Sequence, residues 1–230
     1  MNFSTSEENY IKSIYHLQHS DSLVTTNELA FELNTKAASV TDMLKKLKTK
    51  KLLHYEPYQG FTLSEEGRKV ALSIVRKHRL WEYFLVNKLQ FGWDEVHTIA
   101  EELEHINSLM LIEKLDAYLN YPKFDPHGDP IPDINGKMEA TKQINLIDLE
   151  LNREAEVSAV GSQSTELLEL LRHKNISIGT VLKVIKKFSF DDSIEIRINK
   201  NGSFSISHQL AQTLFVKPLY VSTPGGSISK

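Results

Sequence analysis

A proline-rich segment near the middle of the chain, residues 121 to 132 (YPKFDPHGDPIP), separates two parts with different hydrophobic patterns. Proline fixes φ and lacks an amide hydrogen, so a regular helix does not continue through such a segment. Residues 64 to 120 contain no proline and have helical periodicity, whereas short β-branched runs follow from Ile144 onward. The sequence therefore predicts a mainly α-helical chain with a small β domain after it.

The part that precedes this helical stretch has the pattern of a winged helix-turn-helix. Thr5 and Glu8 have the spacing of a capping box, and a second such pair begins at Thr25. Residues 34 to 36 interrupt the second helix, and a third helix follows with its apolar side chains on one face. Two short β-prone runs around residues 58 to 60 predict a hairpin after it.

Composition excludes several classes of protein. Apolar residues make up 40% of the 230 residues and charged residues 25%, which is ordinary for a globular protein. The chain has no cysteine, so disulfides and thiolate metal ligands are excluded. We find no apolar run long enough to span a bilayer and no leader-like start, and we expect a cytoplasmic protein without a membrane partner.

A local concentration of positive charge marks the third predicted helix. Residues 36 to 51 hold six lysines and one acidic residue, a net charge of +5 in a chain whose net charge is −3. Contacts with DNA phosphates need such a concentration, and the first half of the second helix of a helix-turn-helix enters the major groove. The residues expected near base edges are Lys36, Ala38, Ser39, Thr41 and Asp42, and those expected near phosphates include Lys45, Lys46, Tyr58 and Gln59.

A solvated, lysine-rich helix face is the alternative interpretation of this segment. The capped helix before it, the short turn and the hairpin after it favour DNA binding.

Histidine and glutamate recur at helical spacing between residues 78 and 105. His78 and Glu82 are four residues apart, and a second set consists of His97, Glu101, Glu104 and His105. These spacings place each set on one face of its helix. Imidazole nitrogens mixed with carboxylate oxygens suit divalent manganese, iron or zinc. Solvated side chains would explain one set alone, but two sets after a DNA-binding pattern predict a metal site.

At these residues the chain resembles the diphtheria toxin repressor family, which includes manganese transport regulators. The segment EENYIKSIYHL resembles the family's first helix, VRKHRLWEYFL and VHTIAEELEHI its two metal-ligand helices, and DPHGDPIP the loop after its dimerisation helices. The last third resembles the SH3-like, or FeoA-like, β-barrel of the longer members. The resemblance implies a winged helix-turn-helix domain at residues 1–74, a helical metal-binding and dimerisation domain at 75–140, an SH3-like domain at 144–222 and a polar tail at 223–230.

The resemblance also implies two metal positions. The residues that match the ancillary position are His78, Glu82 and His97, to which the SH3-like domain can add Gln163 and Glu166. The residues that match the primary position are Glu101, Glu104 and His105, together with Asn9 from the first helix.

Two departures from the family pattern affect these positions. Glu101 stands where iron-responsive members often have cysteine, and a carboxylate favours Mn²⁺, with Fe²⁺ as the second candidate and other divalent metals binding in vitro. Lys12 stands where the short manganese regulators have an extra carboxylate. A protonated lysine cannot ligate a metal, so Lys12 argues against their two-metal cluster and leaves a primary position with fewer carboxylates.

The resemblance implies a homodimer that binds double-stranded operator DNA and represses metal-uptake genes when metal is plentiful, with no small organic substrate. One alternative is a metal-independent winged-helix regulator with a structural His/Glu cluster. The other is a di-metal enzyme. We do not expect an enzyme, because the sequence has no Gly-rich phosphate loop, no nucleophile elbow and no H-E-x-x-H motif.

Overall fold

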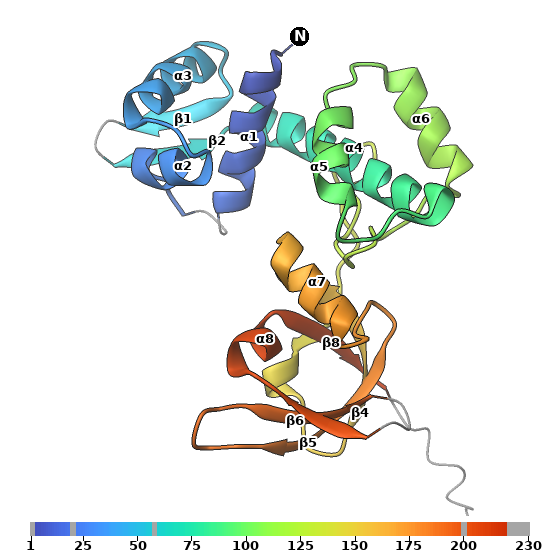
Figure 1. Cartoon of the computed structure of the whole chain (residues 1–230). Coiled ribbons are helices and arrows are strands. Elements are labelled where there is room, and N and C mark those ends of the chain that lie inside the picture. The colour runs from blue at the N-terminus through green and yellow to red at the C-terminus, as the bar shows by residue number, and fades with distance from the viewer. Residues whose placement is uncertain (1–2, 19–21, 57–58, 199–201, 220–230) are drawn as a thin grey trace, which may run out of the picture. The chain divides into compact units, whose positions relative to one another are not determined.

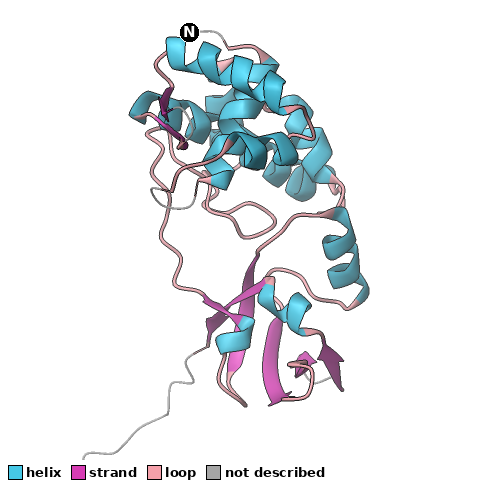
Figure 2. Cartoon of the chain, turned by 90° about the vertical axis from the view of Figure 1, so that its left-hand side faces the viewer, coloured by secondary structure: helices cyan, strands magenta, loops and turns pink. Residues whose placement is uncertain are grey.

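The structure is a computed structural model that describes residues 3–18, 22–56, 59–198 and 202–219 (Figure 1). The chain forms two compact units. The first consists of Met1–Phe91, Val96–Asp125 and Pro130–Glu139, and the second of Gly92–Glu95, Pro126–Asp129 and Ala140–Lys230. Helices predominate in the first unit and strands in the second (Figure 2). This division confirms the prediction of a mainly helical part and a small β domain.

The first unit begins with a winged helix-turn-helix, as predicted. Its elements in chain order are α1 (Thr5–Leu17), α2 (Thr26–Glu32), α3 (Ala37–Thr49), β1 (Leu53–Glu56) and β2 (Gly60–Leu63). The two strands pair antiparallel, and Phe61 of β2 is fully buried. Ile11 and Ile14 of α1 and Leu44 of α3 belong to the same core. The lysine-rich helix α3 therefore packs through its apolar face and leaves its other faces to solvent.

The beginning of α1 differs from the prediction by one residue. Ser4 is the N-cap and forms a capping box with Glu7, whereas the sequence pattern suggested Thr5 with Glu8. Both pairs satisfy the same spacing, so the pattern alone did not distinguish them. The second capping box, Thr25 with Glu28, is confirmed. Since Glu8 does not serve the cap, its carboxylate is free to face another part of the unit.

Three helices complete the first unit: α4 (Glu65–Leu89), α5 (Val96–Leu103) and α6 (Leu109–Tyr118). The 25 residues of α4 span about 37 Å at 1.5 Å per residue. One part of α4 packs against α1, and α5 and α6 also pack against α4. This single helix therefore connects the winged helix-turn-helix to the region that contains the two His/Glu sets.

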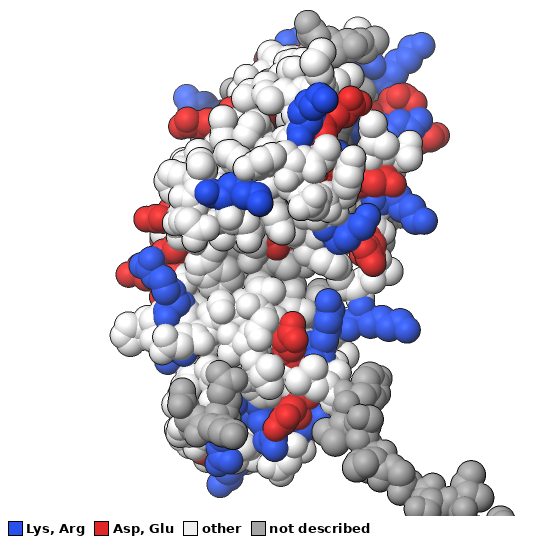
Figure 3. Space-filling view, turned by 90° about the vertical axis from the view of Figure 1, so that its right-hand side faces the viewer, with Lys and Arg blue, Asp and Glu red and all other residues white. Residues whose placement is uncertain are grey.

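The surface of α6 carries large apolar side chains that the unit does not bury. Leu109, Met110 and Tyr118 are 80%, 71% and 62% exposed, and Tyr121 just after the helix is 61% exposed. Figure 3 views the molecule from the side of α6, and uncharged side chains occupy most of the middle of the upper part of this view. Large exposed apolar patches are uncommon on proteins that remain monomeric.

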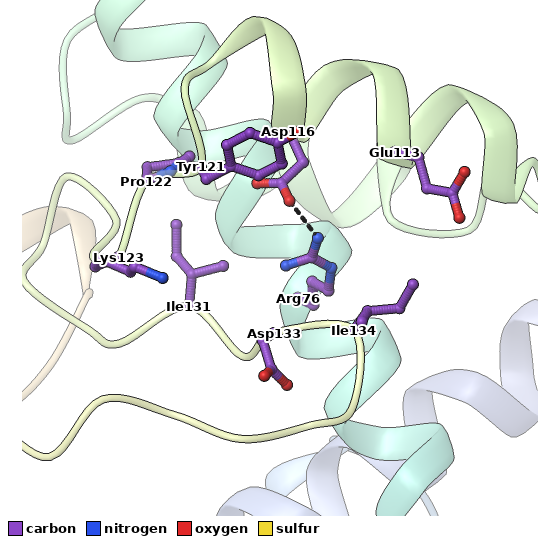
Figure 4. A pocket seen from close by; sticks show the side chains of 9 residues that line it. All are labelled: Arg76, Glu113, Asp116, Tyr121, Pro122, Lys123, Ile131, Asp133 and Ile134. Atoms are coloured by element: carbon purple, nitrogen blue, oxygen red, sulfur yellow. Dashed lines mark hydrogen bonds and ion pairs between the residues drawn. The ribbon is translucent and has the colours of Figure 1, made fainter.

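The proline-rich segment is fastened to α4 by two arginines. Arg76 Nη1 donates a hydrogen bond to the carbonyl oxygen of Pro132 at 2.7 Å, and Arg79 Nη1 donates to that of Pro130 at 2.6 Å. Arg76 also donates to Asp116 of α6 at 2.6 Å. Arg76 and Asp116 line a pocket of about 440 Å³ between α4, α6 and the proline-rich segment (Figure 4). These hydrogen bonds therefore hold the proline-rich segment against α4.

The second unit contains a six-stranded antiparallel sheet. Its elements are β3 (Ile144–Asn145), η1 (Leu146–Asp148), β4 (Glu154–Val160), α7 (Thr165–His173), β5 (Val181–Lys187), β6 (Ile194–Ile198), β7 (Ser203–Ile206), α8 (His208–Gln212) and β8 (Leu214–Pro218). The strand order is β3-β8-β4-β5-β6-β7. Among the described residues the sheet is open, with β3 and β7 at its edges, so closure into a barrel stays a prediction.

None of the helices in the described ranges is both long and apolar enough to cross a membrane.

Candidate metal centre and DNA-binding surface

Three atoms that can bind a metal lie close together, two on side chains of α4 and one on a side chain of α5. The Nε2 atom of His78 lies 2.9 Å from Glu82 Oε1 and 3.2 Å from His97 Nδ1, and the last two atoms are 3.3 Å apart. Two atoms that each bind one ion at about 2.2 Å and at right angles are about 3 Å apart. The spacing of this predicted set, which we call the ancillary set, therefore fits a single divalent ion.

Two of the three side chains of the ancillary set are buried. Glu82 is fully buried and His78 is 5% exposed, whereas the side chain of His97 is 39% exposed. A buried carboxylate is stabilised by a neighbouring positive charge, so a cation close to Glu82 is favoured. The partly exposed imidazole of His97 would leave a bound ion accessible from solvent.

The second ring nitrogen of His78 faces the other predicted set. Its Nδ1 atom lies 2.6 Å from Oε2 of Glu104, which is 1% exposed. His105 Nε2 is 3.9 Å from the other oxygen of Glu104. Glu101 is half-exposed, and its Oε1 is 3.6 Å from His97 Nε2. The residues predicted for the primary position therefore lie next to the ancillary set, and His78 connects the two.

Helix α1 reaches this region through Glu8 and Lys12. Glu8 is buried, and its Oε2 lies 2.6 Å from His105 Nδ1. Lys12 Nζ donates a hydrogen bond to Glu104 Oε2 at 2.7 Å. Asn9, the α1 residue proposed as a ligand from the resemblance, is exposed. The spacing of Glu8 and Lys12, four residues apart, was the available signal that both share one face of α1.

Opposing charges shift the pKa values at the centre. Burial alone would lower the pKa of His78, but its hydrogen bonds to Glu104 and Glu82 raise the pKa above its ordinary value. Burial alone would raise the pKa of Glu104, but His78 and Lys12 lower it. The interactions of Glu104 with His78 and Lys12 therefore favour the charged forms of both His78 and Glu104 despite their burial.

Two further candidate ligands lie in the second unit. Glu166 is exposed in the first turn of α7. Gln163 Nε2 donates a hydrogen bond to Asp129 Oδ2 at 3.0 Å, within the same unit. Their participation in a metal position remains a prediction from the resemblance.

The residues predicted to contact DNA lie mostly on the exposed face of α3. Those exposed among them are Lys36, Ala38, Ser39, Asp42, Lys45, Lys46 and Gln59. Thr41 is half-buried and donates its hydroxyl to the carbonyl oxygen of Ala37 at 2.9 Å. Tyr58 lies outside the described residues. The N-terminal half of α3 therefore exposes polar and small side chains, and their contacts with base edges remain a prediction.

Helix α1 also contacts α3, through the buried carboxylate of Glu7. Its Oε1 lies 2.6 Å from Lys50 Nζ and 3.2 Å from Lys46 Nζ, while its Oε2 accepts a hydrogen bond from the Ser4 amide at 2.9 Å. Burial alone would raise the pKa of Glu7, but the bonds from Lys50, Ser4 and Lys46 lower it to about 2. Glu7 and Glu8 therefore join α1 to α3 and to the metal region, respectively.

Three family models match consecutive parts of the chain. The iron dependent repressor N-terminal DNA binding domain matches residues 2–61, and the iron dependent repressor metal binding and dimerisation domain matches residues 64–133. The FeoA domain matches residues 144–218. The three matches follow the order of the winged helix-turn-helix, the helical region and the antiparallel sheet.

Comparisons with single proteins give the same family. The iron-dependent repressor IdeR of Mycobacterium tuberculosis is 27% identical over 220 residues, which cover 91% of this chain and 96% of IdeR. An HTH-type transcriptional regulator of Methanocaldococcus jannaschii is 40% identical over 120 residues, covering 50% of this chain and 94% of that protein. A solved manganese-dependent transcriptional repressor in complex with manganese has a TM-score of 0.82 and 32% identity, with coverage of 93% and 100%.

Proposed function

The chain belongs to the iron-dependent repressor family, and from this premise we propose that it is a transcriptional repressor activated by Mn²⁺ bound beside His78. The observation that carries the proposal is the convergence of three ligand atoms, from His78, Glu82 and His97, at 2.9 to 3.3 Å from one another. Their nitrogen and oxygen donors fit a divalent transition metal and include no sulfur. Glu101, Glu104 and His105, which match the family's primary position, lie next to these three atoms.

Manganese is proposed ahead of iron because of the donor chemistry. Glu101 offers a carboxylate on the same face of α5 as His97, and a hard oxygen donor suits Mn²⁺. Fe²⁺ accepts the same nitrogen and oxygen donors and is the second candidate. The similar solved structure is described as manganese-dependent, whereas IdeR is described as iron-dependent, so the relatives include both metals.

The active form is proposed to be a homodimer. The matching family model is a metal binding and dimerisation domain, and it covers α4, α5 and α6. The exposed apolar side chains of α6, including Leu109, Met110 and Tyr118, supply a surface that a second copy would bury. A two-fold dimer would present two α3 helices to successive major grooves of operator DNA.

Metal binding is proposed to act on DNA binding through α1. The imidazole and carboxylate ligands lie on α4 and α5, and Glu8 of α1 contacts His105 in the same network. A divalent ion would supply positive charge that draws these carboxylates together. The contact between His105 and Glu8 would then fix the position of α1 relative to the metal region. The contact of Glu7 with Lys50 would fix the position of α1 relative to α3. If the ion binds the DNA-competent arrangement better, it shifts the population toward that arrangement, and DNA tightens metal binding reciprocally.

The target genes proposed from the family resemblance are those for manganese or iron uptake, and such a regulator would act in the cytoplasm with the chromosome. The test is a fluorescence-anisotropy titration on DNA from upstream of these genes, at one fixed salt concentration, with chelator, Mn²⁺ or Fe²⁺. Tight binding only with metal supports the proposal, and the order of the two metals identifies the activator. Equal binding in chelator would establish the metal-independent regulator instead.

A further inference from the structure

We propose that the ammonium group of Lys12 is a built-in cation of the metal centre and takes the place of a second metal ion. The proposal rests on the metal-binding function proposed above and adds the number of ions that the centre accepts. It predicts that the cluster formed by His78, Glu82, His97, Glu101, Glu104 and His105 holds one divalent ion per subunit.

The position of the Lys12 nitrogen carries this inference. Lys12 Nζ lies 2.7 Å from Glu104 Oε2, 3.4 Å from His78 Nδ1 and 3.6 Å from Glu101 Oε1. Glu104 and Glu101 are candidate ligands for an ion at the primary position, and His78 belongs to the ancillary set. The Lys12 side chain is only 12% exposed, so it is held inside the cluster and is not an ordinary surface ion pair.

Charge explains why a cation is needed at this point. Glu104 is 1% exposed, and a buried carboxylate without a positive partner is strongly destabilising. Lys12 supplies that partner permanently, and its three N–H groups let it bind several acceptors at once. A lysine ammonium has no lone pair, so it satisfies the carboxylates without binding metal.

The same ammonium opposes a second divalent ion. An ion bound to Glu104 and Glu101 would lie within a few ångströms of the Lys12 ammonium, and beside the buried Glu104 water screens the repulsion only in part. It could bind there only if Lys12 moved out and left its buried partners. The ancillary set is different, because its three convergent atoms are those of Glu82, His97 and His78 Nε2, on the other side of the His78 ring from Lys12.

Lys12 also gives the metal-free centre a fixed structure. Its hydrogen bond joins α1 to Glu104, which directly follows α5, through protein atoms alone. We therefore expect metal-free protein to keep α1 against the cluster, so that Lys12→Gln destabilises the metal-free form more than the metal-bound form. A lysine with a purely structural role would stabilise both forms equally.

The experiment compares purified wild type with Lys12→Glu, Lys12→Gln and the control Lys69→Gln, whose lysine forms exposed ion pairs with Glu65 and Glu66. Equilibrium dialysis against MnCl₂ with metal analysis counts ions per subunit. Electron paramagnetic resonance distinguishes isolated Mn²⁺ from two ions close enough to couple magnetically. Thermal unfolding in chelator measures the metal-free form, and Lys12→Gln serves if Lys12→Glu does not fold.

We expect Lys12→Glu to bind one more Mn²⁺ per subunit than wild type and to show a coupled signal that wild type and Lys69→Gln lack. Lys12→Gln should gain the same ion with lower affinity and lose thermal stability in chelator. A coupled pair in wild type, or equal ion counts in wild type and both Lys12 variants, would overturn the proposal. Absence of Mn²⁺ from every variant and from wild type would instead refute the metal-binding function on which it rests.

Discussion

Replacing Glu7 by glutamine should weaken the attachment of α1 to α3 through the loss of one negative charge. The Glu7 carboxylate is 2% exposed and lies within 3.2 Å of both Lys46 Nζ and Lys50 Nζ. Glutamine has nearly the same shape and can still accept the hydrogen bond from the Ser4 amide. The substitution therefore tests the charge and leaves the helix cap largely intact.

The pKa of Glu7 sets the upper limit of the effect. A fall from 4.5 to about 2 on folding corresponds to about 3 kcal/mol of unfolding free energy at neutral pH. The lysine side chains are 54% and 31% exposed, so solvent screens part of this interaction. We expect Glu7→Gln to lower the unfolding free energy by about 1 to 2 kcal/mol at pH 7.

The pH dependence has a definite sign. Because folding lowers the pKa of Glu7, its contribution is fully present above pH 4.5 and is lost as the pH falls toward 2. Urea unfolding of wild type and Glu7→Gln, followed by circular dichroism between pH 7 and pH 3, measures the difference. The difference should be constant from pH 7 to about 5 and should shrink below that. Equal stability at pH 7, or a difference that persists unchanged at pH 3, would refute this account of the Glu7 charge.

Three other perturbations test the remaining parts of the mechanism. Glu82→Gln removes the buried charge of the ancillary set and should weaken Mn²⁺ binding at least tenfold, about 1.4 kcal/mol, by calorimetry; unchanged affinity would exclude Glu82 as a ligand. Met110→Glu places like charges across the proposed two-fold interface and should produce monomers in analytical ultracentrifugation, whereas a persistent dimer would place the interface elsewhere. Lys45→Gln should weaken binding equally on all DNA sequences and reduce the salt dependence of log K by about 1 per subunit; a sequence-dependent loss would indicate a base contact instead.

Local signals in the sequence were sufficient for the order of elements and for the pairing of His78 with Glu82, whereas the grouping of His97 with these two residues came from the family resemblance. Capping residues and apolar periodicity located the winged helix-turn-helix, and four-residue spacing placed His78 and Glu82 on one face of α4. The iron-dependent repressor family, resembled at the level of motifs, is confirmed by the family models. The domain boundaries, the closed barrel and the ligand roles remain predictions.

Contacts between distant segments could not be derived in this way. Ser4 with Glu7 and Thr5 with Glu8 fit the same capping pattern, and only the burial of Glu8 against His105, 97 residues away, distinguishes them. Because the capping box uses Glu7, the Glu8 carboxylate can face His105 in the metal region, and Asn9 is exposed. The partner of Lys12, 92 residues further along the chain, was equally hidden, because side-chain spacing within one helix says nothing about which helix lies opposite.

The first turns of α1 therefore have a fixed angular register. Within them, Glu7 faces α3, Glu8 faces His105, and Lys12 reaches Glu104 one turn later. Each residue of an α-helix advances the side-chain direction by about 100°. Inserting a single alanine between Glu8 and Lys12 would rotate Lys12 by about 100° around the helix axis relative to Glu7 and Glu8. All three charged side chains would still be present, but they could no longer make their contacts at the same time. Helix α1 should consequently accept many substitutions on its outer face, while a change of its length by one residue would disconnect metal sensing from the DNA-binding helix.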